Sequence, residues 1–228
     1  MLVTRPEAEA RATLAALAAA GHQGVPAPVL RIAPLPFIVP RQRFDAIIIT
    51  SANAVRPGLP CASGTPLYVV GTRTARALAR ESYDAPRHIA EDAKGLVQAL
   101  KAASPSPAAL LYIAGRDRKS DIETLLGKIG HHITVLVTYE AIAAEAFAPA
   151  IRDDLAAGRI DAVLHFSRRS AGIFVAMMMA AGLGAPLRQM RHYCLSRDVA
   201  VPLEQAGAAG ISPAARPDEA HLLALIDG

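Results

Sequence analysis

Short polar clusters follow several apolar segments of this 228-residue chain. They combine Gly, small hydroxyl residues and Arg: Thr4-Arg5-Pro6, Thr50-Ser51, Gly71-Thr72-Arg73-Thr74, Gly115-Arg116-Asp117, Ser167-Arg168-Arg169-Ser170 and Ser196-Arg197. Hydroxyl groups, guanidinium groups and the free N–H groups at a helix start all donate hydrogen bonds to anions. The recurrence of the pattern predicts binding sites for an anionic ligand. At any single position, simple N-capping of the following helix is the alternative.

Tyr139 is a further candidate for chemistry. It follows an apolar segment at a predicted junction between domains, where its hydroxyl could give a proton or a hydrogen bond to a ligand; packing at the junction is the alternative. His131-His132 have no Cys or carboxylate at metal-ligand spacing, and Cys61 and Cys194 form no disulfide or metal pattern. We therefore expect no metal site. The sequence also has no Walker A motif and no complete glycine fingerprint of a dinucleotide loop.

The apolar segments alternate with helix-like segments. Short aliphatic runs bounded by turn residues predict strands at about residues 1–4, 25–30, 46–50, 67–70, 87–90, 110–114, 133–137, 162–166, 192–195 and 209–212. Helices are expected at about residues 7–20, 74–81, 94–102, 120–129, 170–181, 200–205 and 218–226. This alternation predicts an α/β fold with parallel sheets covered on both faces, in which the polar clusters lie at the carboxyl edges of the sheets.

Three pairs of segments repeat one another in a changed order. Residues 44–54 resemble 160–171, residues 68–75 resemble 193–200, and residues 2–5 resemble 112–116. Two similar doubly wound parallel-sheet domains, one inserted into the other, satisfy all three repeats. We expect a discontinuous domain of residues 1–31 plus 143–228, an inserted domain of residues 36–136, and inter-domain crossings at 32–35 and 137–142. A cleft between two such domains would bind a small molecule.

Composition narrows the classes of partner. With 52% hydrophobic and 19% charged residues the chain is globular, and no apolar run is long enough to span a bilayer. No signal peptide is visible, so we expect a cytoplasmic protein. The net charge of +4 comes with scattered Arg and few aromatic residues, which argues against nucleic acid and fits a small polyanion.

The ordered set of motifs resembles the uroporphyrinogen-III synthase family over essentially the whole chain. The motifs are VTRP at 3–6, TSANAV at 50–55, VGTRTA at 70–75, GRD at 115–117, VTYEA at 137–141 and FS at 166–167. Two loops depart from the family pattern. Residues 166–170 read FSRRS where a Thr-Ser-Pro-Ser run is usual, and residues 196–199 read SRDV where the family often shows Gly and two hydroxyl residues.

The resemblance implies a cyclising lyase. Such an enzyme converts the linear tetrapyrrole hydroxymethylbilane to uroporphyrinogen III, with inversion of ring D and loss of water, and uses no cofactor. Tyr139 matches the family's tyrosine proposed to help the terminal hydroxyl leave, and Ser51 and Thr74 match positions that line the cleft. Because the bilane also closes without enzyme, to the wrong isomer, the resemblance implies catalysis mainly by positioning.

The remaining expectations concern the other binding residues and the partners. Substrate contacts are expected from Thr4, Arg5, Thr50, Gly71, Thr72, Gly115, Arg116, Ser167 and Ser196. We expect a monomer that contacts the upstream bilane-forming enzyme transiently and binds neither nucleic acid nor a membrane. Two alternatives stay open: a two-lobed anion-binding protein without catalysis, and a nucleotide-dependent enzyme, against which the missing glycine fingerprint counts.

Overall fold

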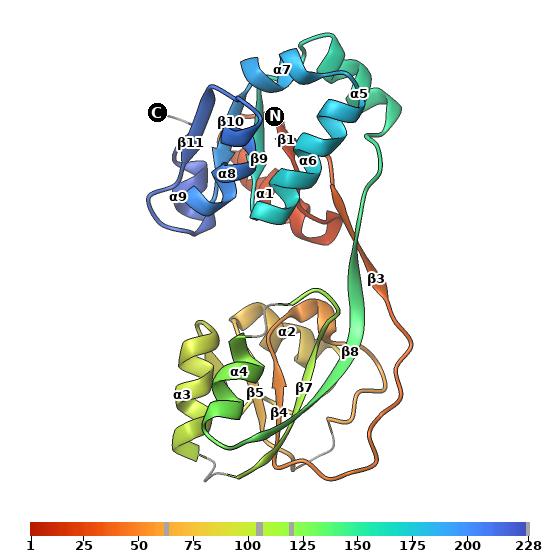
Figure 1. The fold of residues 1–228 in the computed structure, drawn as a ribbon, viewed down its shortest axis with the longest axis vertical. Helices are drawn as coiled ribbons and strands as arrows, with labels where there is room; N and C mark the ends of the chain where they lie inside the picture. Colours follow the sequence, from red (N-terminus) through yellow and green to blue (C-terminus); the bar gives the residue numbers. More distant parts are fainter. Residues whose placement is uncertain (62–63, 104–106, 119–120, 227–228) are drawn as a thin grey trace. The chain divides into compact units, whose positions relative to one another are not determined.

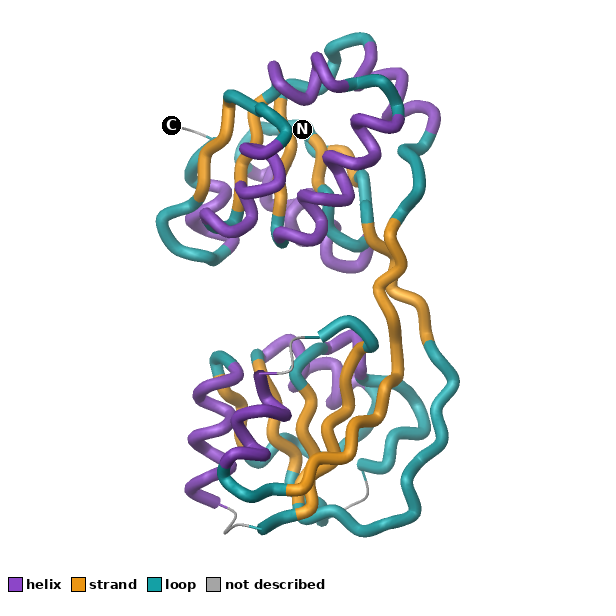
Figure 2. The backbone as a smooth tube through the Cα atoms, in the orientation of Figure 1, coloured by secondary structure: helices purple, strands orange, loops and turns teal. Residues whose placement is uncertain are grey.

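The computed structural model describes residues 1–61, 64–103, 107–118 and 121–226. The chain forms two compact units, each of which is described by itself. Unit 1 comprises Met1–Arg31 and Ile142–Gly228, and unit 2 comprises Ile32–Ala141. The chain passes between the units twice, along the two strands β3 and β8 whose bounds are given below (Figure 2).

Unit 1 contains a five-stranded parallel sheet in the order β11-β10-β9-β1-β2. Its strands are β1 (Leu2–Val3), β2 (Val25–Pro26), β9 (Ala162–His165), β10 (Arg191–Cys194) and β11 (Gly210–Pro213). Its helices are α1 (Glu7–Ala19), α5 (Pro149–Ala156), α6 (Arg168–Ala180), α7 (Gly184–Gln189), α8 (Arg197–Gln205) and α9 (Glu219–Leu223).

Helices cover both faces of the unit 1 sheet (Figure 1). On one face, Val3 and Leu164 pack with Leu17 of α1 and Leu222 of α9 in one buried cluster. On the other face, His165 contacts Phe174 of α6, with ring centroids 5.1 Å apart. Alternate residues of β9 therefore point into two separate cores, which explains why all four residues of the strand are buried.

Unit 2 contains a six-stranded sheet in the order β3-β8-β7-β4-β5-β6. Its strands are β3 (Leu30–Pro34), β4 (Ala46–Ile49), β5 (Leu67–Val70), β6 (His88–Ala90), β7 (Ala109–Gly115) and β8 (His132–Ala143). Its helices are the 3-10 turn η1 (Ala52–Ala54), α2 (Thr72–Arg80), α3 (Ala93–Ala103) and α4 (Asp121–Lys128).

Two clusters fill the two faces of the unit 2 sheet. Ile48 packs in one cluster with Leu96 of α3 and Leu126 of α4. Its neighbour Ile49 packs in the other with Leu78 of α2. Strands β4 to β8 are parallel. The sheet is thus doubly wound, as the sequence predicts, and all its central strands end at the same edge.

The two sheets have the same circular strand order. Reading β8-β7-β4-β5-β6 in unit 2 against β2-β1-β9-β10-β11 in unit 1 pairs each strand with its counterpart. The three sequence repeats fall on these counterparts, because β4 matches β9, β5 matches β10, and β7 matches β1. Unit 1 is therefore a circularly permuted version of the same fold.

The structure corrects several details of the predicted elements. Eleven strands are described where ten are expected, because the predicted strand 25–30 is two strands, β2 and β3. Strand β3 contains Pro34, which is tolerated because β3 lies at an edge of its sheet. Helices α5 and α7 are additional. None of the helices within the described ranges is long and apolar enough to cross a membrane.

The connections between the units are also more regular than the Pro-rich sequence suggests. Leu35 N donates to Thr138 O at 3.0 Å, and Ala144 N donates to Val29 O at 2.9 Å. The order of these bonds shows that β3 and β8 run antiparallel to one another. A paired ribbon satisfies the backbone groups that a loop would leave to water.

Candidate functional site

The predicted site residues lie at the carboxyl ends of strands in both units. In unit 1, Thr4 and Arg5 follow β1, Ser167 follows β9 and Ser196 follows β10. In unit 2, Thr50 and Ser51 follow β4, Gly71 and Thr72 follow β5, and Gly115 ends β7. Ligands of open parallel sheets bind at this edge.

Two of the unit 1 hydroxyls serve the fold. The buried Thr4 Oγ1 donates to Leu164 O at 2.8 Å. Ser167 Oγ accepts a hydrogen bond from Ser170 N at 3.1 Å and so caps α6. Ser196 is different, because it stands at the N-cap of α8 without a side-chain capping bond. The first turn of α8 is therefore open to an external acceptor.

Arg5 is held by neighbours within unit 1. Its Nη1 donates to Glu219 at 2.9 Å and to Thr13 at 3.2 Å. Its guanidinium also stacks on the ring of Phe166, 4.3 Å from the centroid. This ion pair joins the strand end to α9, so the charge of Arg5 is already largely neutralised.

The end of β4 places two hydroxyl groups at the edge of the unit 2 sheet. Thr50 Oγ1 and Tyr112 Oη are hydrogen-bonded at 2.9 Å. Ser51 Oγ accepts from Asn53 N at 3.2 Å and caps the turn η1. Burial raises the pKa of Tyr112, and the hydrogen bond with Thr50 offsets part of this shift.

The start of α2 resembles the start of α8. Gly71 has a φ of +79°, which only glycine adopts without strain, and it leaves α2 without a side-chain cap. Thr72 is exposed in the first turn, whereas Thr74 is buried. Like the first turn of α8, this turn has no side-chain cap, and backbone N–H groups of this kind can bind an anion.

Tyr139 and Gly115 are brought together by an irregularity in the sheet. The register of β7 and β8 passes from Ala114–Val137 directly to Gly115–Tyr139, so Thr138 is an extra residue, as in a β-bulge. A Cβ on residue 115 would lie 2.6 Å from Tyr139 Cζ and 2.9 Å from its hydroxyl oxygen. The absence of a side chain at Gly115 is what allows the phenol to lie over the end of β7.

Arg116 lies beside this pair. Its backbone N donates to Tyr139 O at 2.8 Å, and its guanidinium forms an ion pair with Glu140. The structure therefore groups Tyr139, Gly115 and Arg116 at one strand end. Arg116 helps to fix the backbone of Tyr139 and keeps an exposed cation at this edge.

Sequence reasoning missed two neighbours of Tyr139. Tyr112 lies inside an apolar strand and reads as core, although its hydroxyl reaches Thr50 at the edge. Arg56 lies in the loop after η1, and no local motif distinguishes it from the other arginines. Its electrostatic interaction with Tyr139 depends on the way β8 passes η1, where Thr138 Oγ1 bonds Ala54 O, and this is a tertiary feature.

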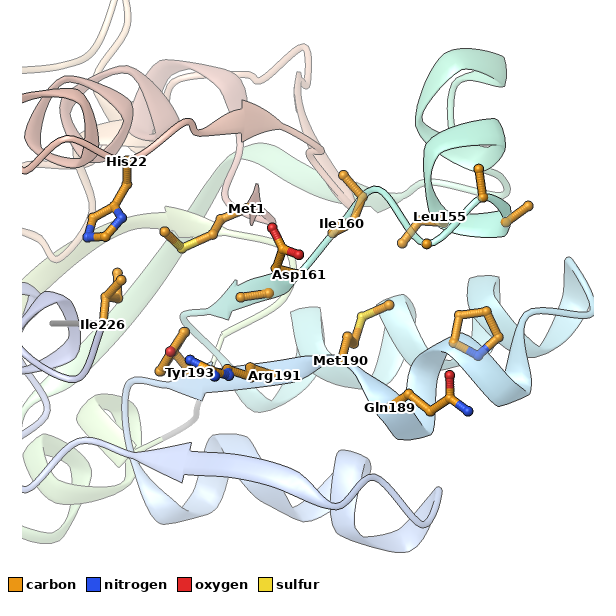
Figure 3. A pocket seen from close by; sticks show the side chains of 15 residues that line it. Met1, His22, Leu155, Ile160, Asp161, Gln189, Met190, Arg191, Tyr193 and Ile226 are labelled. Carbon is orange, nitrogen blue, oxygen red and sulfur yellow. The ribbon is translucent and has the colours of Figure 1, made fainter. Parts of the chain in front are cut away.

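A separate cavity of about 780 Å³ opens at the other edge of the unit 1 sheet (Figure 3). Met1, Asp161 and Arg191 project into it from the amino ends of β1, β9 and β10. None of the predicted site residues lines this cavity. Among the residues placed by the structure there is also no group of three His, Cys, Asp or Glu side chains able to hold a metal ion.

The fold defines a class: an α/β protein of two circularly related parallel-sheet units, with polar loops at the carboxyl edges of the sheets. A family model described as "Uroporphyrinogen-III synthase HemD" matches residues 11–224. The chain belongs to the uroporphyrinogen-III synthase family. It is a cyclising lyase of tetrapyrrole biosynthesis that closes hydroxymethylbilane with inversion of ring D and loss of water.

Solved structures share this fold. Uroporphyrinogen-III synthetase from Helicobacter pylori is 17% identical with a TM-score of 0.66, and the match covers 91% of this chain and 92% of that one. A mutant uroporphyrinogen III synthase from the extremely thermophilic bacterium Thermus thermophilus is also 17% identical, with a TM-score of 0.55 and coverage of 99% and 96%. No curated protein sequence matches the chain.

Proposed function

We propose that Tyr139 is the catalytic residue of this synthase and that the carboxyl edges of the two sheets bind the carboxylates of the bilane. The observation that carries the proposal is the placement of Tyr139 over Gly115 at the end of β7. This position presents a phenol among hydrogen-bond donors, at the edge where ligands of parallel sheets bind.

The role follows from the first bond to break. The C–O bond of the hydroxymethyl group breaks with its electron pair moving to oxygen, and Tyr139 donates its proton to this oxygen, so that water leaves. The remaining electrophilic azafulvene is attacked by the substituted end of ring D. The spiro intermediate then fragments and recloses with ring D inverted, and the proton lost as the ring regains aromaticity restores the tyrosine.

Binding is assigned to groups that the fold leaves open. The first turns of α2 and α8 have no side-chain cap, and they begin at Gly71 and Ser196. Thr72 adds an exposed hydroxyl in unit 2, and Arg116, which is paired with Glu140, adds an exposed guanidinium whose other N–H groups can donate to a substrate carboxylate. The many acetate and propionate groups of a linear tetrapyrrole suit such sites. Thr4, Arg5, Thr50, Ser51, Thr74 and Ser167 support these positions through the contacts within each unit.

The cellular setting belongs to the same proposal. We propose a cytoplasmic enzyme that works as a monomer and receives its unstable substrate from the bilane-forming enzyme. Light scattering of the purified protein tests the monomer: a single species near 23.9 kDa is expected, and a stable dimer would contradict it.

The substitution Tyr139→Phe tests the catalytic assignment. It removes one oxygen from a partly buried side chain, so the fold should persist while turnover falls by about tenfold to a hundredfold, at or below the usual scale for one acid–base group. Turnover should be followed with bilane generated in place by the upstream enzyme. Unchanged turnover at unchanged melting temperature would make Tyr139 a packing residue.

A further inference from the structure

The loop after β4 holds an arginine in a fixed place. Tyr83 Oη donates to Arg56 O at 2.7 Å and accepts from Leu59 N at 2.9 Å. One tyrosine thus closes the loop from Arg56 to Leu59 at both ends. The position of the Arg56 backbone is therefore set by packing within unit 2.

The same loop is tied to the strand that carries Tyr139. The buried Thr138 Oγ1 donates to Ala54 O at 3.0 Å, two residues before Arg56. Val55 and Tyr139 pack against the same hydrophobic cluster. Burial lowers the pKa of Arg56, and the nearby Tyr139 hydroxyl offsets part of that shift. The segment that carries Arg56 and the strand that carries Tyr139 are thus joined through Ala54 and Thr138, on the face of the sheet where Val55 and Tyr139 pack.

Within the described residues, the Arg56 side chain has no partner of its own. Its Nε is buried and unbonded, and no ion pair to Arg56 is found in this part of the chain. Arg5 is the other arginine of the described ranges that is not exposed, and it pairs with Glu219 at 2.9 Å. A partly buried cation without a counter-ion is unfavourable in the empty protein, and an incoming anion relieves that cost.

We propose that Arg56 binds one carboxylate of the linear tetrapyrrole next to Tyr139 and thereby positions the hydroxymethyl group for departure. The inference rests on the proposed role of Tyr139. The planar guanidinium can hold an acetate or propionate group by two hydrogen bonds, which fixes the orientation as well as the location of the attached pyrrole ring. Arg56 is thus a positioning residue and takes no proton itself.

The test compares Arg56→Gln and Arg56→Lys with the control Arg43→Gln. Arg43 is an exposed arginine just before β4, at the opposite edge of the same sheet, so the control makes the same change of charge away from the site. Two quantities are measured: KM and kcat with enzymatically generated bilane, and Kd for uroporphyrin III, the stable oxidised form of the product, from its fluorescence. Melting temperatures show whether each variant is folded.

We expect Arg56→Gln to raise both KM and Kd by about tenfold or more, on the scale of one charge-assisted hydrogen bond, with a smaller change in kcat. The KM and Kd of Arg56→Lys should lie between those of Arg56→Gln and the native chain, because lysine keeps the positive charge but cannot donate the two parallel hydrogen bonds of a guanidinium. Arg43→Gln should change neither constant by more than about twofold. If Arg56→Gln does not fold, the KM and Kd of Arg56→Lys test the proposal.

Two results would overturn the proposal: KM and Kd equal to those of Arg43→Gln, or a fall in kcat with Kd unchanged. The binding measurement does not involve Tyr139 chemistry. If Tyr139→Phe kept full turnover, the catalytic assignment would fail, and the Kd of Arg56→Gln would still decide whether Arg56 holds a carboxylate.

Discussion

Tyr139 lies so close over Gly115 that a Cβ at position 115 would be 2.6 Å from Tyr139 Cζ. The contact joins the end of β7 to the bulge in β8, and it fixes where the phenol hydroxyl is held. Gly115 is therefore part of the proposed site because it carries no side chain that would displace Tyr139. The motif at residues 115–117 indicates a polar strand end like others in this chain. Only the register of β7 and β8 explains why position 115 must be glycine.

Gly115→Ala should lower turnover about as much as Tyr139→Phe. The new methyl group must push the aromatic ring aside, since separations below 3.0 Å are not found in proteins, and a displacement of about 1 Å is enough to cost a hundredfold in rate. The measurement is kcat with enzymatically generated bilane. Gly127→Ala is the control, because a Cβ at Gly127 in α4 meets nothing within 4 Å.

The double variant sharpens this test. If Gly115 acts through the tyrosine hydroxyl, adding Gly115→Ala to Tyr139→Phe should lower kcat little further. Losses that multiply would show that Gly115 serves another purpose, such as backbone binding of the substrate.

Much of the fold could be predicted from the sequence. The alternation of apolar strands and helices, and the three repeats, are confirmed as two doubly wound sheets with one circular order. Helix α7 was missed because Gly184 and Pro186 read as a stop, although Pro is favourable in a first turn. The ribbon of β3 and β8 was missed because its bonds join residues more than 100 positions apart.

The location of the candidate residues at strand ends could be predicted from the sequence, but their contacts could not. Local motifs locate strand ends, because the residues that cap helices also bind anions. These motifs do not show that Arg5 forms an ion pair with Glu219, whereas Arg56 has no counter-ion among the described residues. Those differences depend on which distant element passes each strand end.

Ser196→Asp should stabilise the protein and weaken substrate binding. A carboxylate at the N-cap of α8 interacts favourably with the open first turn, by about 0.5 kcal/mol, and it occupies the place proposed for a substrate carboxylate. We expect a higher melting temperature together with a KM raised by roughly fivefold to tenfold. Ser196→Ala, which leaves the N–H groups free, should change KM little; an equal rise in KM in both variants would show that the hydroxyl, not the helix end, binds substrate.

The buried histidine pair of unit 1 should make stability sensitive to acid. His192 Nε2–H donates to Leu187 O at 2.8 Å, so its Nδ1 accepts from His165 Nε2 at 3.1 Å. Burial lowers the pKa of both histidines, and for His165 the neighbouring ring lowers it further. Both are therefore neutral in the folded protein near neutral pH.

The sign of the effect follows from linkage. The unfolded chain binds protons at the ordinary histidine pKa of about 6.5, and the folded chain does not, so stability is full above that pH and falls below it. Below this pH, each histidine lowers the free energy of unfolding by up to about 1.4 kcal/mol per pH unit. The free energy of unfolding should be measured in urea at pH 7.5 and 5.5. Between these pH values it should fall less for His192→Gln than for the native chain. The exposed control His132→Gln should lose as much as the native chain. Equal losses in all three would contradict the account.

The most direct test of the central claim is the identity of the product. Bilane generated enzymatically should be incubated with the purified protein, and the porphyrins formed after oxidation should be separated by isomer. The spontaneous reaction gives isomer I, so an enzyme that directs the attack must give isomer III in excess, at a rate that rises with protein concentration. The account predicts this excess for the native chain and a reduced share of isomer III for Arg56→Gln. The same isomer mixture with the protein as in buffer would contradict it.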